Sequence, residues 1–368
     1  KAARYFISGN YMKEQGIVIG SDFEQMGARG KVDANYKKFT FGTNLSFNYS
    51  VYNIVPTEDR YKEETIVASA LAMSPTMPVY NADGSYNFDQ WNWQYKHPQI
   101  VNPVALANEK EDQMKRYRFM GNVYGEYELY KNLKFKTSFN FDLINYNTLD
   151  YTNPKLGPAK ENGGGVSRLN TRTFSWTWNN IVTYDKTIGE HHFNVLAGME
   201  SYSYRYDELT ASRSKMAQPD MPELVVGSQL TGGSGYRIDY ALVGYLTQLL
   251  YDYRNKYFFS ASYRRDGSSR FAPETRWGNF WSLGASWRVD RESFMASTSD
   301  WLSALTLKMS YGAQGNDNLG TYYASKGLYS IVSNLGENAL VPDRMATPNL
   351  KWETNLNFNV GIDFSLFN

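Results

Sequence analysis

The segment LKFKTSFNFDL, residues 133–143, alternates apolar and polar side chains along most of its length. Leu133, Phe135, Phe139, Phe141 and Leu143 fall on one side of the pattern, and lysine, serine, asparagine and aspartate fall on the other. Alternation with a period of two is typical of a β-strand that has one apolar and one polar face. What the apolar face contacts decides whether such strands build a soluble sheet or a membrane barrel.

The same pattern recurs in about twelve segments along the 368 residues. They lie near residues 3–12, 24–37, 39–54, 115–129, 133–146, 171–185, 191–206, 238–253, 256–266, 276–289, 304–314 and 352–367. Many exceed ten residues, whereas strands of soluble proteins usually run about five or six. A tilted strand that crosses a bilayer needs about nine to eleven residues.

The connections between these segments fall into two alternating classes. Tight connections lie at 36–39, 129–133, 185–191 and 252–257, and longer ones at 13–23, 55–114, 147–170, 207–237 and 315–351. Two connections fit less well, because 267–275 is short for its class and 290–303 is long. Short turns at one end and long loops at the other are typical of outer-membrane barrels.

The two faces of the expected strands also favour a membrane barrel. The polar face carries asparagine, serine, threonine, glycine and scattered charges, which suits a crowded, wet lumen. The apolar face carries rings near both strand ends, as with Tyr117 and Tyr127, or Phe174 and Tyr184, which indicates aromatic girdles. The sequence therefore predicts an all-β fold, a transmembrane antiparallel β-barrel, with a large soluble β-sandwich or solenoid as the alternative.

Composition excludes several classes of function. The chain has no cysteine, so it has no disulfide, thiolate metal site or cysteine nucleophile. Its formal charge of +1 gives no reason to expect a nucleic-acid partner. No apolar run is long enough for a transmembrane helix, and the first residues do not have the apolar core of a signal peptide.

Several segments together resemble one family, the SusC-like TonB-dependent transporters of the bacterial outer membrane. They are YFFSASYRRDGSSRFAPETRWGNFWSLGASWRV at 257–289, LKMSYGAQGNDNLGTYY at 307–323, TPNLKWETNLNFNVGIDF at 347–364, MPVYNADGSY at 77–86 and VLAGMESY at 195–202. One departure is Trp281, where many relatives carry proline. The resemblance covers essentially the whole chain.

The resemblance implies that residues 1–368 are the central part of one β-barrel domain of about 22 strands. It implies that the plug domain, the TonB box, the first strands and the final strands are not in this sequence. It also implies active import of oligomeric nutrients, usually oligosaccharides and in some relatives peptides. The implied partners are a SusD-like surface lipoprotein, the TonB complex acting through the missing N-terminal parts, and outer-membrane lipid. No cofactor and no enzymatic activity are implied.

Two other functions stay open from the residues alone. A complete, smaller outer-membrane barrel could act as a pore or as a membrane-embedded hydrolase, and a structural β-protein of a surface assembly is the third hypothesis. In RRDGSSRF, residues 264–271, Ser268 or Ser269 could be a nucleophile with Asp266 as its orienting acid. A serine nucleophile needs an adjacent base, usually histidine, and the three histidines are distant in sequence. We therefore favour a tight loop in which Asp266 and Gly267 form the turn and arginine pairs with aspartate across it.

Neither of two possible metal sites is convincing. Adjacent residues on a strand point to opposite faces, so His191 and His192 are expected to diverge. The segment NADGSYNFD, residues 81–89, spaces oxygen side chains like a calcium loop but has no terminal glutamate. An Asx-Gly turn is the better prediction. We predict no catalytic, metal or cofactor site.

Recognition is expected in the long loops. Residues 55–114 are predicted to form a long extracellular loop insertion with a short helix at 63–73. An aromatic run follows the helix and could contact substrate or partner: Tyr86, Phe88, Trp91, Trp93 and Tyr95. Loops 207–237 and 315–351 are expected to join 55–114 in meeting a lid or a substrate. Alternation parity predicts these lumen-lining residues: Arg118, Glu126, Asn140, Asp142, Asn357 and Asp363.

Overall fold

The computed structural model describes residues 2–55, 65–87, 101–156, 159–298 and 300–367. Twelve long strands form one antiparallel sheet in which each strand pairs with its neighbours in chain order, β1 through β11 and then β14. The strands are β1 Ala2–Gln15, β2 Asp22–Tyr36, β3 Phe39–Asn53, β4 Lys110–Tyr130, β5 Leu133–Thr152, β6 Gly165–Ile188, β7 His191–Met216, β8 Gly227–Tyr253, β9 Tyr257–Ser268, β10 Trp277–Arg288, β11 Leu302–Asn316 and β14 Glu353–Leu366. The predicted fold class and all twelve expected strands are confirmed.

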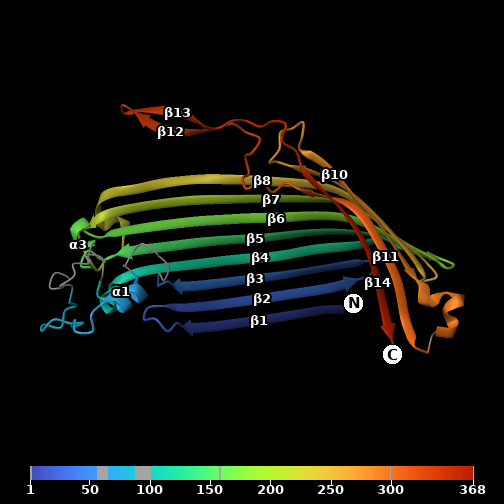
Figure 1. The fold of residues 1–368 in the computed structure, drawn as a ribbon, viewed down its shortest axis with the longest axis horizontal. Helices are drawn as coiled ribbons and strands as arrows, with labels where there is room; N and C mark the ends of the chain where they lie inside the picture. The colour runs from blue at the N-terminus through green and yellow to red at the C-terminus, as the bar shows by residue number, and fades with distance from the viewer. Residues whose placement is uncertain (1, 56–64, 88–100, 157–158, 299, 368) are drawn as a thin grey trace.

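The sheet is open and strongly bent. β1 and β14 are its two edges, and β9, β10, β11 and β14 run at a steep angle to β1–β8 (Figure 1). Several strands are longer than predicted, above all β8, which has 27 residues. At roughly 3.3 Å per residue such a strand is about 90 Å long, well over what a bilayer crossing requires. The predicted loop 207–237 is therefore wrong: most of it is strand, and only residues 217–226 connect β7 to β8.

The two ends of the sheet differ as expected. At the short-turn end, connections of two or three residues join β2–β3, β4–β5, β6–β7 and β8–β9. Lys37 and Asn132 take left-handed backbone conformations there, which tight hairpin turns require. The β10–β11 connection at this end is longer and contains the 3-10 helices η2 Val289–Arg291 and η3 Ser293–Thr298. The remaining connections, all of six residues or more, leave the opposite, long-loop end.

The apolar residues of the alternating pattern share one face across the whole sheet. Strand register places Phe139 of β5 beside Val123 of β4 and Trp178 of β6. These three side chains are 39%, 49% and 45% exposed, and rows like them continue to Phe358 on β14. Among the described residues, nothing packs on these apolar rows, and only the strand tips at the long-loop end are covered on this face. A soluble sandwich would bury it, so a continuous exposed surface of this size indicates lipid contact.

The apolar surface forms a band of bilayer height. On β5 it runs from Leu133 to Leu143, on β3 from residue 39 to 49 and on β6 from 174 to 184, about eleven residues each. We call this surface the membrane band. Above it, towards the long-loop end, the same face becomes polar. Asn145 donates a hydrogen bond to Asn170, and at the upper limit of the band, directly opposite Phe174, Arg205 pairs with Asp239 at 2.7 Å. The strands therefore project out of the membrane at the long-loop end.

The opposite, polar face is hollowed. Cavities of about 780, 500 and 260 Å³ lie on it, lined mainly by side chains that alternate with the membrane band. Asn122 and Asn140 hydrogen-bond across β4 and β5 at 2.6 Å, and Arg118 binds both oxygens of Asp142 at 3.0 and 2.7 Å. Polar side chains on this inner face thus satisfy one another along neighbouring strands.

The loops at the long-loop end pack on one another. α1 Ile66–Ala72 and α2 Pro103–Glu109 belong to the 54–109 connection, and α3 Ala159–Asn162 to the β5–β6 connection. Leu106 and Leu156, 5% and 2% exposed, share a small core with Val101. The expected helix in the 55–114 insertion is confirmed as α1, with Thr65 capping its first turn. No helix in the described part of the chain is both long and apolar enough to cross a membrane.

A separate core lies on the outer face of the strand tips. The β7–β8 connection, with the 3-10 helix η1 Leu224–Val226, folds over Leu149, Tyr151 and Val166. The 317–352 connection also contains structure that the sequence did not predict. It carries a two-stranded hairpin, β12 Leu328–Asn334 and β13 Glu337–Arg344, which stands clear of the main sheet in Figure 1.

Candidate functional site

The six residues predicted from parity lie on the inner face of the sheet. Arg118, Asn140 and Asp142 are close together, and the last two line the cavity of about 500 Å³. Asn357 lines the cavity of about 260 Å³ on β9–β14. Glu126 pairs with Lys134 at 3.3 Å, and Asp363 pairs with Lys308. Whether these side chains line a transport path stays a prediction.

The five predicted aromatic contact residues are only partly covered. Phe88, Trp91, Trp93 and Tyr95 lie outside the described residues. Tyr86 is half-buried, stacks on Tyr80 with ring centroids 5.4 Å apart, and packs on the core formed by Leu106 and Leu156. The turn at Asn81–Ser85 is an Asx-Gly turn as predicted, with the Ser85 amide donating to Asp83 and Gly84 at φ 82°.

The RRDGSSRF segment is not the turn that the sequence suggested. Asp266 and Gly267 lie inside β9, and the loop to β10 is 269–276. Arg264 binds Asp266 along its own strand at 2.7 Å and Glu200 of β7 at 2.6 Å. Gly267 lies against the Trp277 ring, and a Cβ atom there would be 3.0 Å from it, so a side chain at this position would have to displace the ring.

The serines of this segment are held by structural hydrogen bonds. Ser268 is fully buried and donates to Asp317 at 2.7 Å, and Ser269 accepts from the Ala241 amide at 3.0 Å. His191 and His192 lie at the opposite end of the strands, where His191 contacts the Tyr251 hydroxyl and His192 contacts Asp252. The two rings diverge as predicted. Neither described histidine can serve as a base for these serines.

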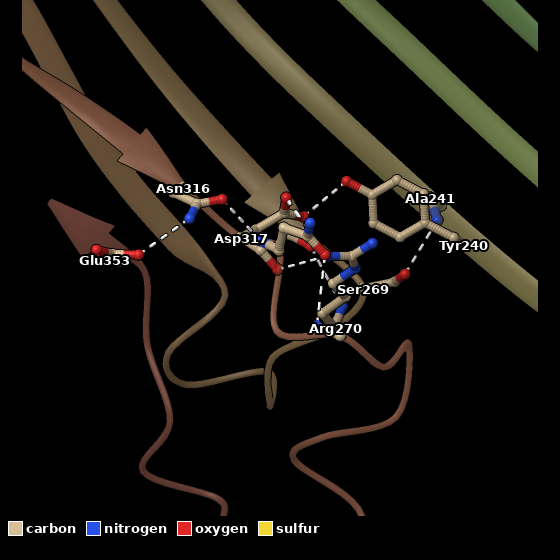
Figure 2. Close-up of polar contacts among 10 residues, drawn as sticks. Tyr240, Ala241, Ser269, Arg270, Asn316, Asp317 and Glu353 are labelled. Carbon is tan, nitrogen blue, oxygen red and sulfur yellow. Dashed lines mark hydrogen bonds and ion pairs between the residues drawn. The ribbon is translucent and has the colours of Figure 1, made fainter. Parts of the chain in front are cut away.

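One polar cluster at the long-loop end joins segments that are far apart in sequence (Figure 2). Asp317, at the start of the β11–β14 connection, accepts hydrogen bonds from Tyr240 of β8 at 2.6 Å and Ser268 of β9 at 2.7 Å. Arg270 donates to the Asp317 carbonyl at 2.7 Å and to the Asn318 side chain at 3.1 Å. We call Tyr240, Ser268, Arg270, Asp317 and Tyr322 the clamp.

Arg270 is the centre of the clamp. Its guanidinium lies 4.9 Å from the ring centroid of Tyr240 and 4.8 Å from that of Tyr322, so two rings hold it. Its side chain is only 10% exposed, and Asp317 supplies the nearest opposite charge at 3.9 Å. A buried cation needs such partners, because an unpaired one is costly in a low-dielectric site.

The β9–β10 loop, residues 269–276, also fixes the C-terminal end of the 317–352 connection. Trp352 donates to the Arg276 carbonyl at 2.7 Å, and Thr275 donates to the Leu350 carbonyl at 2.8 Å. The Trp352 ring packs on Phe271, which is 2% exposed, with centroids 5.5 Å apart. The β9–β10 loop therefore holds both ends of the 317–352 connection against the inner face.

The clamp could not be read from sequence spacing. Its hydrogen-bonded members are 47 to 77 positions apart, as with Arg270 and Asp317 or Tyr240 and Asp317. The only local signal is the NDN run at 316–318, where Asn316 accepts from the Asn318 amide and donates to Glu353 at 2.9 Å. Such a run predicts a turn but not its partners.

A second charged group lies in the projecting part of the sheet. Asp112 of β4 is opposite Asp150 of β5 in the register, and Lys110 pairs with it at 3.0 Å. Burial raises the pKa of Asp112 to about 6; Lys110 opposes this increase and Asp150 adds to it. In the described part of the chain, no group of three or more His, Asp or Glu side chains is placed to hold a metal ion.

Comparison with known proteins agrees with this architecture. No family model matches the chain. It is 29% identical over 377 residues to TonB-dependent receptor P3 of Formosa agariphila, which covers 99% of this chain and 37% of that protein. It is 26% identical over 392 residues to TonB-dependent receptor SusC of Bacteroides thetaiotaomicron, covering 99% of this chain and 38% of that one.

A solved structure gives the same result for the fold. The RagAB peptide transporter superposes with a TM-score of 0.86 at 22% identity, over all of this chain and 41% of the other. The chain thus spans somewhat more than a third of the length of the curated relatives it matches. The predicted resemblance and the predicted location, the bacterial outer membrane, are both confirmed by these matches and by the membrane band.

Proposed function

We propose, from the premise that this chain is a SusC-like section of an outer-membrane β-barrel, that it forms part of the wall of a TonB-dependent importer of oligomeric nutrients. The observation that carries the proposal is the contrast between the two faces of one continuous sheet. The outer face is an exposed apolar band of bilayer height, and the inner face is polar and hollow. A wall of this kind separates lipid from a passage wide enough for a solute.

The rest of the importer follows from the proposal. Unpaired strand edges are costly in lipid, so β1 and β14 are expected to pair with further strands of the same protein. The long-loop end is the extracellular end, and a SusD-like lipoprotein covers it. TonB acts on a plug inside the barrel, from the periplasmic side. The 54–109, 269–276 and 317–352 connections face the lipoprotein or the arriving substrate.

Oligosaccharides are the substrates we favour, and peptides are the alternative. No catalytic step is proposed, because Ser268 is buried in the clamp, Ser269 accepts from the Ala241 amide, and neither serine has a described histidine beside it. Asn140 and Asp142 lie on the passage side of the wall and Phe139 on the lipid side. Arg118, Glu126, Asn357 and Asp363 extend the passage side along β4 and β14.

The test uses the complete protein in its own bacterium. Deletion of the gene is expected to abolish uptake of one class of labelled oligomer, and a protonophore or loss of TonB is expected to do the same. Asn140→Trp narrows the passage side and is expected to slow uptake at normal outer-membrane abundance. Asn145→Trp, on the outer face above the membrane band, is the matched control and is expected to leave uptake unchanged.

The outcomes separate the candidate functions. Uptake that persists without TonB would indicate a passive pore. Ester hydrolysis by the purified protein in detergent, lost in Ser268→Ala, would indicate an enzyme. Co-purification of a surface lipoprotein with the full-length protein would support the lid.

A further inference from the structure

Five tyrosines gather on the inner face at the long-loop end, above the membrane band. Tyr204 and Tyr206 come from β7, Tyr236 and Tyr240 from β8, and Tyr322 from the β11–β14 connection. The ring centroids are 5.7 Å apart for Tyr204 and Tyr322, 5.6 Å for Tyr240 and Tyr322, and 5.8 Å for Tyr206 and Tyr236. We call these five residues the tyrosine surface.

The tyrosine surface is fixed but not buried. The clamp holds Tyr240 and Tyr322 on either side of Arg270, and the register sets Tyr204 directly opposite Tyr240. Tyr236 is 50% exposed, and Tyr206 is half-buried. Rigid tyrosines with accessible faces bind partners at low entropic cost, since few rotatable bonds are immobilised.

The polar groups at this surface are acceptors and hydroxyls. Glu208 accepts hydrogen bonds from the hydroxyls of Tyr206 and Tyr236, the latter at 3.2 Å. The cation of the clamp, Arg270, is already enclosed by rings and bonded to Asp317. Arg205 and Arg237 occupy the opposite parity on the same strands and pair with Asp239 and Asp207. Within the described tyrosine surface, no cation is left to receive an anionic ligand.

We propose that the tyrosine surface is a contact site for uncharged oligosaccharides on their way into the barrel. Sugar rings pack their C–H faces on flat aromatic rings, and their hydroxyls match Glu208 and the phenol groups. Sulfated or uronate oligosaccharides would be repelled by Glu208. The proposal rests on the proposed function and adds a site and a charge preference to it.

A peptide is the alternative ligand for this surface. Peptides add to exposed strand edges or place their terminal carboxylate in a nest of donors. β7 is paired on both sides along the tyrosine surface, but β8 pairs with β9 only from Leu242 onwards, so the β8 edge beside Tyr236 and Tyr240 is open to a peptide backbone. Glu208 disfavours a terminal carboxylate here, and the flat rings suit sugar faces, so we favour a sugar.

The test measures binding to the full-length protein in lipid nanodiscs. The probes are enzymatic digests of neutral glucans, mannans and xylans, a digest of a polyuronate, and a tryptic peptide mixture. Tyr236→Ala and Tyr206→Ala are each expected to raise the Kd for the bound neutral digest by about three- to tenfold. Tyr236→Phe keeps the ring and is expected to change Kd by less than about twofold. Tyr130→Ala, which removes an exposed tyrosine at the short-turn end of β4, is the matched control.

Each possible result supports or overturns the sugar site, the proposed function, or both. Preference for the polyuronate digest, or equal binding by Tyr236→Ala, Tyr206→Ala and wild type, overturns the tyrosine surface and leaves the importer standing. Peptide binding that these variants weaken moves the surface to peptides and overturns the sugar assignment. Absence of uptake of every oligomer by cells that carry the complete system would instead overturn the proposed function.

Discussion

On β5 the outward side chains between residues 133 and 143 are leucine and phenylalanine except for Thr137, whereas those at 145 and 147 are asparagine. At the same height on the inner face, the structure changes from cavities lined by small polar groups to the clamp and the tyrosine surface. The membrane band is stabilised by lipid and needs no partner residues. The long-loop end projects into water, so specific hydrogen bonds and ring contacts must hold its loops. The same strands are thus stabilised by lipid contact over one part of their length and by specific side-chain contacts over the other.

The most damaging change should be a charge in the membrane band. Phe139→Arg places a cation on the lipid face near the middle of β5, and we expect it to lower the free energy of unfolding by about 2–4 kcal/mol. Urea titration of the full-length protein in lipid vesicles measures the effect. Asn145→Arg, on the same face of the same strand above the band, should cost no more than about 1 kcal/mol. Equal costs at the two positions would mean that the bilayer does not end between them.

The next prediction concerns the clamp, at the long-loop end of the strands. Arg270→Ala leaves Asp317 without its nearest cation, and we expect local opening of residues 317–323 to become easier by about 1–3 kcal/mol. Hydrogen exchange of the amides in this segment measures it, and global unfolding should change less. Arg265→Ala is the matched control, because Arg265 also lies over a ring, that of Trp277 at 5.2 Å, but is exposed. Unchanged exchange in Arg270→Ala would show that the clamp does not hold the loop.

Asp112 gives the projecting strands a dependence on pH. Its folded pKa of about 6 lies above the ordinary value of 3.8, so between these values the folded state binds more protons than the unfolded state. This contribution therefore favours folding below about pH 4 and weakens as the pH rises through about 6, by about 3 kcal/mol at most. Hydrogen exchange in β4 near residue 112, followed from pH 4.5 to 7.5, should show the loss. Asp112→Asn should remove the dependence, and a slope of the opposite sign would exclude this group as its cause.

The sequence predicted the strands of the membrane band much better than the structure of the long-loop end. Alternation identifies strands where the two faces meet different solvents, and lipid on one side makes that contrast strong. Past Leu143 both faces of β5 carry polar groups, so the strand continues without a visible pattern. The Asp266–Gly267 turn was wrong because Arg264 and Trp277, which decide that geometry, act through strand pairing.

The recognition residues were harder still. The clamp depends on contacts between Arg270, Asp317 and Tyr240, which no local spacing encodes. The tyrosine surface combines two strands and a distant loop, each with unremarkable tyrosines. The parity rule nevertheless placed Asn140 and Asp142 on the correct face, because it depends on the pleat alone.

The smallest effect is expected at the upper limit of the membrane band, where Arg205 lies directly opposite Phe174. Arg205 and Asp239 pair at 2.7 Å with both side chains 52% exposed, so their interaction is screened by water and salt. Arg205→Ala should change the free energy of unfolding by about 0–1 kcal/mol, and a double-mutant cycle with Asp239→Ala should give a coupling that shrinks as salt is added. A coupling of several kcal/mol that ignores salt would mean that this pair is inside hydrocarbon. The membrane band would then extend past Phe174 on β6, and the projecting wall that carries the tyrosine surface would be shorter than we infer.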